Sequence, residues 1–398
     1  MSVDPYKLNI VTQNIRTLGH GTSGIWTRKL VKDHFQHINH SIDIILLQEH
    51  HLLAEACLDK TSQLNFLEGP SFWNEARILP TSNKTKGGTA ILTSRHLAPL
   101  IGDSGIIVPG RAQFITLNMS PSETIGIINV YGYSDSSKRA TLWEAINEAP
   151  LPPAQWILAG DFNMIESLDD KLGGAEKSKM YIPESEAWNR TILKFNLGDS
   201  FHMPEFRRLT KKRYTWDNGQ IAQHRVATRI DRIYLPPKLQ AMGGQMGILA
   251  TLHRISDHAP FVLKLSKAPP KTPRSQPFNN SMLTDTEGRQ LLIDAWHQGM
   301  LQSPEADWGK KLRNALRSVK AASDAFSYRK KKAWQNTYDQ EINEILEAEI
   351  ALQEDWGNET ARKALSAAQT KIQNVRQQRL EKRTNRASAQ WTRVGDRC

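Results

Sequence analysis

The sequence predicts an α/β fold of the α+β type, in which two packed β-sheets with helices outside them precede a mainly α-helical extension. Short apolar runs separated by turns recur through the first two-thirds of the chain, with few long helical patterns between them. The polar, Pro-rich stretch 267–277 is typical of an extended linker. Beyond it the sequence lacks strand alternation, and strong helix formers dominate.

The strand and helix predictions rest on hydrophobic periodicity. The run 43–48 is apolar without alternation, as expected for a strand that is buried on both faces. Helices are predicted at 26–38, where apolar residues share one face, and at 184–195, which follows Pro183. The other predicted strands are 8–13, 88–93, 112–119, 124–131, 155–160, 229–235 and 260–265.

The composition divides the chain into three expected parts. We expect a sandwich domain at 1–267, a linker at 268–283 and a basic helical extension at 284–398. The extension should contain two to four long helices with a break near 356–358. The chain is long enough for one large α/β domain with such an appendage.

The charge and cysteine content narrow the class of protein. The net charge is +11, and 361–398 holds ten Lys or Arg against two acids, which favours a polyanionic partner, although a solvated helix face is the ordinary alternative. Cys57 and Cys398 are too few for a disulfide framework or a Cys-based zinc site and favour a reducing compartment. With no signal-peptide pattern and no apolar run of membrane-spanning length, we expect an intracellular protein, nuclear or cytoplasmic, without a membrane partner.

Polar residues follow several of the predicted strands, at positions where a sheet edge holds side chains rigidly. Taken singly they have ordinary explanations, because Gly-Asp-Phe-Asn suits a turn and Ser-Asp-His suits a loop or helix cap. Together they supply carboxylates for Mg²⁺, amides for orientation and an imidazole with a carboxylate, as metal-assisted phosphodiester hydrolysis needs. The residues are Asn14, Glu49, Asn129, Tyr131, Asp161, Asn163, Asp231, Asp257 and His258.

These blocks resemble the endonuclease/exonuclease/phosphatase superfamily, which includes DNase I and the apurinic/apyrimidinic endonucleases. The matching segments run in family order from Gln13 to His258: Gln-Asn, Leu-Gln-Glu, Gly-Gly-Thr-Ala, Asn-Val-Tyr, Gly-Asp-Phe-Asn, Thr-Trp, Arg-Ile-Asp and Ser-Asp-His. The resemblance covers the whole first domain. It implies a four-layered αββα sandwich of the DNase I-like type, with the site at one edge.

The resemblance also implies how a metal is held. Glu49 would be the principal Mg²⁺ ligand with Asn14 beside it, and Asp257 would be a further ligand of the metal or of water. Mn²⁺ is the alternative cation.

The remaining roles implied by the resemblance concern the phosphate. Asp161 and Asn163 would position or activate the attacking water, and Tyr131 would donate to a phosphate oxygen or assist the leaving group. His258 would stabilise charge on the phosphate, and Asp231 would orient His258. The resemblance leaves the general base unassigned.

Within the superfamily the sequence most resembles the apurinic-type endonuclease domain of LINE-type non-LTR retrotransposon polyproteins. Tyr-Thr-Trp at 214–216, the Thr-Arg-Ile-Asp-Arg-Ile-Tyr block and the closing Ser-Asp-His-Ala-Pro-Phe-Val are similar to that version. The segment 391–398 is similar to the Trp-x-x-x-Gly-Asp segment that precedes the reverse transcriptase. The resemblance implies nicking of DNA to leave a 3′-OH for target-primed reverse transcription, element RNA as a second partner and covalent continuation into a reverse transcriptase.

A basic cluster precedes the Tyr-Thr-Trp motif and is interpreted as a contact to the DNA backbone, with a solvated loop as the alternative. It comprises Arg207, Arg208, Lys211, Lys212 and Arg213. Thr215 matches a family position near the phosphate, with packing as the alternative role. A His-rich stretch that includes His34 lacks evident partners for zinc, so we interpret it as structural.

Three functions stay open at this point. The first is a Mg²⁺-dependent DNA endonuclease. The second keeps the fold but changes the substrate, to an abasic site, RNA, or a lipid or nucleotide phosphate, since fold does not fix substrate. The third is a non-catalytic nucleic-acid-binding or assembly module that uses the helices. The basic extension favours a polymer, and the filled catalytic positions favour an enzyme.

Overall fold

The computed structural model describes residues 8–19, 21–38, 42–54, 56–57, 67–79, 84–174, 181–220, 224–252, 255–265, 278, 280–283, 285–302, 308–355 and 357–395. Of these, the side chains of 21–26, 37, 280–281, 331 and 378–395 are outside the description. Most of the predicted linker at 268–283 therefore lies outside the described residues, as do Cys398 and the side chains of the segment that begins at Trp391.

Seven strands of the described chain form the first sheet, in the order β13-β17-β18-β1-β2-β6-β3. At its centre, β1 (Leu8–Asn14) runs parallel to β2 (Ile44–Gln48) and antiparallel to β18 (Phe261–Leu265). The flanking strands are β3 (Glu68–Asn74), β6 (Thr89–Ser94), β13 (Phe206–Arg208) and β17 (Gly244–Ile248).

The second sheet has six described strands in the order β12-β16-β10-β9-β8-β7. Here β10 (Gln155–Asp161) runs parallel to β9 (Glu123–Tyr131) and antiparallel to β16 (Asp231–Leu235). The flanking strands are β7 (Ile101–Val108), β8 (Ala112–Ser120) and β12 (Gly198–Asp199). Two smaller described sheets comprise β4 (Arg77–Ile78) with β5 (Thr85–Lys86), and β11 (Lys171–Leu172), β15 (Ala227–Thr228) and β14 (Trp216–Asp217).

The main core lies between the two sheets. Ile10 and Leu46 of the first sheet belong to one buried cluster with Ile127 and Ile157 of the second. Successive strand residues point to opposite faces, so Val11 points away from this core, yet it is also fully buried. Burying each such side chain contributes about 1.5–3 kcal/mol, and burial on both faces explains the unbroken apolar runs in the sequence.

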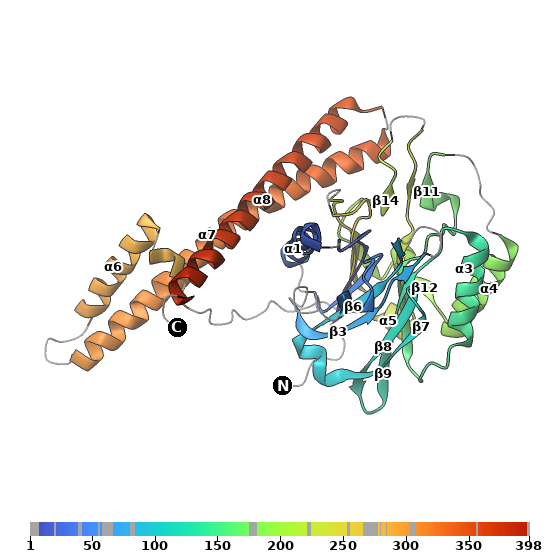
Figure 1. Ribbon diagram of the computed structural model, residues 1–398, viewed down its shortest axis with the longest axis horizontal. Coiled ribbons are helices and arrows are strands. Elements are labelled where there is room, and N and C mark those ends of the chain that lie inside the picture. The colour runs from blue at the N-terminus through green and yellow to red at the C-terminus, as the bar shows by residue number, and fades with distance from the viewer. Residues whose placement is uncertain are drawn as a thin grey trace. The chain divides into compact units, whose positions relative to one another are not determined.

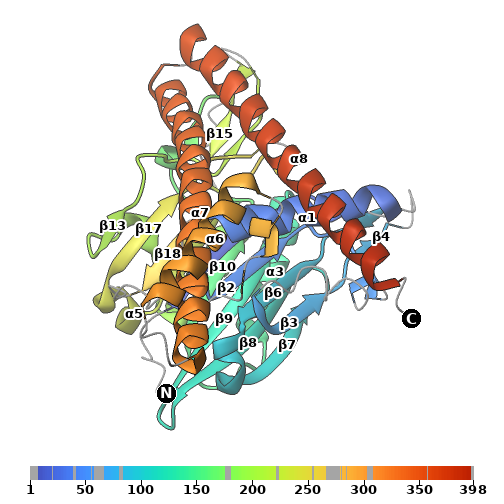
Figure 2. The same ribbon diagram turned by 90° about the vertical axis from the view of Figure 1, so that its left-hand side faces the viewer.

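Helices cover both outer faces. α1 (Gly21–His37) lies over the first sheet (Figures 1 and 2), and α3 (Ser136–Glu148) and α4 (Ile182–Phe195) lie over the second (Figure 1). Trp143 of α3 and Trp188 of α4 belong to one core cluster with strand residues of the second sheet. The predicted α+β sandwich of DNase I-like type is confirmed.

Several strands and one helix were not predicted from the sequence, for identifiable reasons. β3 contains Gly and Pro, and β7 contains Gly and Asp, and both are edge strands that show no clean alternation. Helix α3 was not predicted either. It begins at a polar cap, because the Asp135 carboxylate accepts a hydrogen bond from the backbone N–H of Lys138 at 3.0 Å.

Three long helices follow in the described chain, in agreement with the predicted number and break: α6 (Thr286–Leu301), α7 (Trp308–Glu354) and α8 (Glu359–Gly395). The folded units, however, do not follow the compositional boundaries. Residues 344–398 belong to the same compact unit as the sandwich, and 269–343 form a second unit, with Met282, Leu292 and Phe326 in its core. None of the described helices has an apolar stretch long enough to cross a membrane.

Candidate active site

Three candidate residues form one row across the second sheet. Tyr131 at the end of β9 pairs with Asp161 at the end of β10, and Asp161 pairs with Asp231 at the start of β16. Neighbouring strands lie about 4.8 Å apart, so the three backbones are held rigidly side by side. The geometry of the sheet therefore brings together residues that are 100 positions apart in sequence, from Tyr131 to Asp231.

The first sheet supplies the opposite wall. Asn14 ends β1 and pairs with Gln48 of β2, and Glu49 follows directly. The side-chain amide of Asn14 donates to Asp161 Oδ2 at 2.9 Å, which joins the two sheets at the site. The hydroxyl of Ser256 donates to the backbone carbonyl of Asn14 at 2.6 Å and so fixes the loop that carries His258.

His258 and Asp231 form a buried pair, with His258 Nδ1 2.8 Å from Asp231 Oδ2. Burial alone would lower the pKa of His258, but the charge and hydrogen bond of Asp231, with Asp161 and Asp257 nearby, outweigh it and raise that pKa to about 9. Near neutral pH the ring is therefore a cation with both nitrogens protonated. Asp231 occupies Nδ1–H, which leaves Nε2–H as the donor for a ligand.

Asp161 is fully buried and held by amide donors. Its Oδ1 accepts from the backbone N–H of Asn163 at 2.9 Å, and its Oδ2 accepts from the side-chain amides of Asn14 and Asn163. Burial, with the repulsion of Asp231, raises the pKa of Asp161 to about 7 against the attraction of His258. A carboxyl group with such a pKa is able to exchange a proton near neutral pH.

Glu49 faces this pair from the first sheet. The hydroxyl of Tyr131 donates a hydrogen bond to its carboxylate. Burial raises the pKa of Glu49 above its ordinary value, although His258, Asn14, Arg111 and Arg16 oppose the shift. A partly buried carboxylate of this kind gains from a cation at close range.

Arg111 belongs to the site but was missed by the sequence reasoning. Its guanidinium lies 4.2 Å from the ring centroid of Tyr131 and 4.1 Å from that of Tyr133, and it donates to the carbonyl of Gly132 at 3.2 Å. These contacts hold the Tyr131 ring in place by cation–π attraction. The only sequence signal was its place before a strand, at Pro-Gly-Arg-Ala, and no motif marks it.

The backbone around the site is conformationally unusual. Arg16, Glu49 and Asn163 all have left-handed φ values, of 56°, 58° and 51°. Such conformations cost energy in residues other than glycine and are concentrated at functional sites. Gly160 has a φ of 145°, and a Cβ there would lie 1.9 Å from the carbonyl oxygen of Val130, so the residue before Asp161 must be glycine.

The site offers two sets of candidate ligands for a divalent cation. Ligand atoms of Asp161, Asp231 and His258 lie within 4.8 Å of one another, but a protonated His258 bound to Asp231 offers no lone pair. The oxygen donors of Glu49, Asn14 and Asp257 suit a hard cation better. One oxygen of Asp257 accepts from the indole N–H of Trp216 at 3.0 Å, and the other is buried without a hydrogen-bond partner.

The predicted DNA-contacting residues divide into two groups. Arg207, Arg208, Lys211 and Arg213 are exposed. Lys212 is not, because its ammonium is buried and lies 2.7 Å from the Glu349 carboxylate of α7, which corrects the expectation of a backbone contact there. Arg207 and Arg208 are also on β13, three strands from β1, or about 14 Å to the side.

Thr215 is likewise turned inward, with 1% of its surface exposed. Its hydroxyl oxygen accepts hydrogen bonds from the backbone N–H groups of Ile230 and Asp231, at 3.1 and 3.0 Å. The structure therefore favours the packing alternative, in which Thr215 holds the backbone of Asp231. A direct contact with the phosphate stays a prediction.

Thr215→Val is expected to lower the free energy of unfolding by about 1–3 kcal/mol, because two buried N–H donors would lose their acceptor. Thr215→Ser keeps the oxygen and should cost markedly less. Urea unfolding of the two variants measures the difference. Equal stability of both variants would show that the hydroxyl does not hold this backbone.

Comparisons with known proteins agree with this arrangement. A profile of the Endonuclease/Exonuclease/phosphatase family matches residues 11–258, and the chain belongs to that family. Members are generally hydrolytic nucleases or phosphatases that depend on divalent metals, so the chain is an enzyme of the hydrolase kind. No curated protein sequence matches it.

One solved structure shows the same fold, and two others are similar at lower TM-scores. The AP endonuclease LMAP from Leishmania major has a TM-score of 0.51 and 16% identity, covering 67% of this chain and 90% of that chain. The 3′-5′ exonuclease NExo from Neisseria meningitidis has a TM-score of 0.47 and 19% identity, covering 65% and 100%. The endonuclease domain of TRAS1, a telomere-specific non-LTR retrotransposon, has a TM-score of 0.41 and 13% identity, covering 65% and 98%.

Proposed function

We propose that this chain is a Mg²⁺-dependent endonuclease that hydrolyses a phosphodiester bond of DNA and leaves a 3′-OH. The observation that carries the proposal is the meeting of two walls at one edge of the sandwich. Asp161 and Asp231 belong to the second sheet, and Glu49, Asn14 and the loop of His258 belong to the side of the first. The Asn14–Asp161 and His258–Asp231 hydrogen bonds join the two sides.

Glu49, Asn14 and Asp257 are the proposed ligands of Mg²⁺. Their oxygens are of the hard type that Mg²⁺ prefers. The cation, when bound, acts as a Lewis acid that neutralises charge developing on the phosphate. Tyr131 donates to Glu49 and so limits where that carboxylate points.

The chain's own residues are proposed to perform the proton transfers. Ionised Asp161 accepts a proton from the attacking water, and Asn163 and Asn14 hold the carboxylate in position. As the new O–P bond forms, the P–O3′ bond breaks and the O3′ takes up a proton from solvent water to become the hydroxyl. His258 donates from Nε2–H to a phosphate oxygen throughout and keeps its own proton.

DNA is the proposed substrate class because the chain carries a net charge of +11 and exposes Arg207, Arg208, Lys211 and Arg213. The retrotransposon-like motifs support a role for the 3′-OH as primer for reverse transcription, with element RNA as template. The first test uses supercoiled plasmid with Mg²⁺ or with EDTA, beside Glu49→Ala. We expect open circles with Mg²⁺ alone, ends that a polymerase extends, and no nicking by the variant.

A plasmid that stays supercoiled would count against the proposal, and two further substrates then separate the alternatives. Cleavage restricted to an abasic oligonucleotide would indicate a repair-type nuclease. Release of phosphate from a small phosphoester would indicate a phosphatase. Salt-sensitive binding without any cleavage would indicate a binding module.

The pH dependence of nicking should be bell-shaped. Asp161 must be ionised, so the rate rises through about pH 7, and His258 must be protonated, so the rate falls through about pH 9. Asp231→Asn removes the charge that raises the pKa of His258 and should move the alkaline limb to lower pH. The measurement is kcat across this range, and an unmoved alkaline limb would contradict the assignment.

A further inference from the structure

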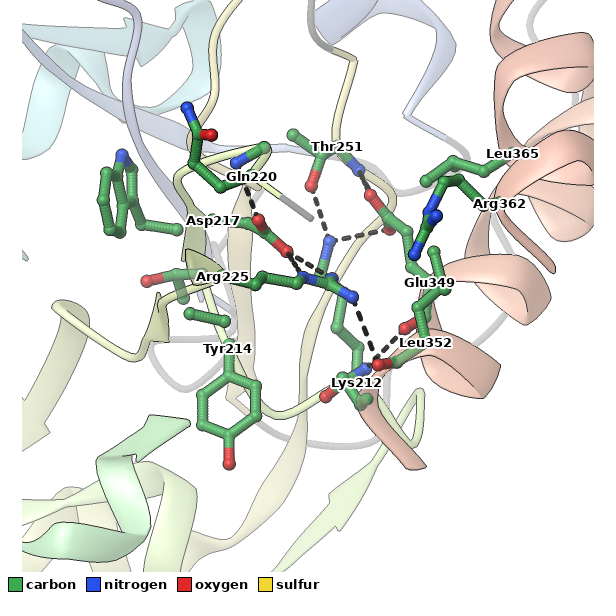
Figure 3. Close-up of a pocket in the computed structure, with 15 residues that line it drawn as sticks. Lys212, Tyr214, Asp217, Gln220, Arg225, Thr251, Glu349, Leu352, Arg362 and Leu365 are labelled. Carbon is green, nitrogen blue, oxygen red and sulfur yellow. Dashed lines mark hydrogen bonds and ion pairs between the residues drawn. The ribbon is translucent and has the colours of Figure 1, made fainter. Parts of the chain in front are cut away.

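The end of α7 and the beginning of α8 contact the catalytic domain through buried polar groups. The helical segment 344–376 lies in the same compact unit as the sandwich. Both carboxylate oxygens of Glu349 lie 3.3 Å from the backbone N–H of Thr251, and one of them pairs with Lys212 at 2.7 Å (Figure 3). An ion pair with side chains 7% and 8% exposed is a strong constraint on where the helix lies.

Two more contacts reach the segment that leads into the active site. Gln353 accepts from the backbone N–H of Arg213 at 2.9 Å, and the Leu352 carbonyl accepts from Arg225 at 3.2 Å. Arg225 also binds Asp217, so it links the helix to the β14–β15 hairpin. A cavity of about 170 Å³ lies beside these contacts, and Lys212, Arg225 and Glu349 are among the residues that line it.

The segment 213–216 directly supports the catalytic pair His258 and Asp231. Thr215, two residues after Arg213, holds the backbone of Asp231, and Trp216 pairs with His258 in an isolated β-bridge. A movement of 213–216 would therefore displace both members of the pair.

A second contact lies on α8. Arg376 Nη2 is 3.5 Å from His34 Nδ1, His34 Nε2 is 3.1 Å from Gln13 Oε1, and Gln13 Nε2 donates to the backbone carbonyl of His258 at 2.9 Å. All four residues are buried.

One assignment of protons satisfies this whole series. Gln13 donates to His258 from its amide nitrogen, so its oxygen accepts, and His34 must carry its proton on Nε2. Neutral His34 then accepts at Nδ1 from Arg376. Each group therefore donates a hydrogen bond to the next, from Arg376 on the helix to the backbone carbonyl of His258. It accounts for His34, whose histidine-rich stretch suggested no metal partners.

We propose that the helical segment 344–376 is a positioning element of the catalytic site, in which Glu349 acts through the 213–216 segment and Arg376 acts through His34 and Gln13. The inference rests on the proposed function, because it assigns this role within that same site. Removal of residues that support metal ligands typically changes activity by about 10–100-fold, and we expect a similar effect here because small misplacements of catalytic groups lower the rate.

The test uses the full chain with Arg376→Met, which keeps the length of the side chain but not the donor, and Arg376→Lys, which keeps a donor. We expect Arg376→Met to lower kcat for nicking on the order of tenfold with KM nearly unchanged, and Arg376→Lys to recover most of it. Lys371→Met, an exposed change on the same helix, is the control and should leave kcat unchanged.

The contact of Glu349 with Lys212 and Thr251 is tested with Glu349→Gln. Glu347→Gln, an exposed change on α7, is the control. A loss of kcat in Glu349→Gln alone supports the proposal. Unchanged kcat in both Arg376→Met and Glu349→Gln would overturn it. A rise in KM with kcat intact would also overturn it, because the helices would then bind substrate.

Hydrogen exchange separates this proposal from the proposed function. The backbone N–H of His258 donates to Ser256 Oγ at 3.0 Å, and its exchange should be faster in Arg376→Met than in the wild type and in Lys371→Met. This readout needs no activity. If wild-type protein fails to nick DNA but the exchange rate changes, the function is wrong and the positioning stands. Unchanged exchange would show that Arg376 does not support this loop.

Discussion

Asp161→Asn is expected to lower kcat for nicking by about 10²–10⁴-fold, the range for loss of a general base. The substitution keeps the size of the side chain but removes the carboxylate that we propose accepts the proton of water. DNA binding should persist, since Asp161 is fully buried and contributes negative charge. The measurements are single-turnover nicking rate and DNA affinity at the same salt concentration.

The control for this variant is Asp169→Asn, an exposed carboxylate eight positions further along the chain. It changes the net charge by the same amount without touching the site. A nicking rate in Asp161→Asn close to that of Asp169→Asn would show that Asp161 is not the base. The role would then pass to another carboxylate near the phosphate.

His258→Ala is expected to lower kcat by about 10²–10³-fold, the effect of removing one donor that stabilises transition-state charge. Because Asp231 would act through His258, Asp231→Asn should add nothing once the imidazole is gone. The double variant should therefore match His258→Ala, since residues that act as one unit are strongly non-additive. Circular dichroism checks that each variant is folded, and His297→Ala, exposed on α6, is the control.

Additive losses in the double variant would contradict this reading. They would mean that Asp231 also acts independently of the ring, on the substrate, on the metal or on the pKa of Asp161.

The fold was predictable because its central strands carry a simple signal. β1, β2, β9 and β10 are buried on both faces, so each appears in the sequence as an apolar run that ends at a polar residue. Those end residues are the candidate site residues, and the structure brings them to one edge. Their catalytic roles stay predictions.

The parts that were missed depend on contacts with no local signal. Lys212 appears in the sequence as one member of a basic cluster, yet its partner Glu349 is 137 positions away. Arg111 is recognised as a site residue only from its contacts with the rings of Tyr131 and Tyr133, which the sequence does not show. The compositional boundary at 284 reflects helix-forming residues, and composition cannot show which helical residues pack back on the sandwich.

The pairing of β1 with β18 has a consequence for how the protein is made. Leu8 pairs with Leu265, which the ribosome adds much later in synthesis, and β1 lies in the middle of its sheet. Chains are synthesised at about 5–20 residues per second, so β1 lacks its antiparallel neighbour β18 for many seconds. His258 precedes that neighbour, so a nascent chain cannot assemble the His258–Asp231 pair until almost the whole sandwich has been synthesised. The order of synthesis thus delays the assembly of the candidate active site.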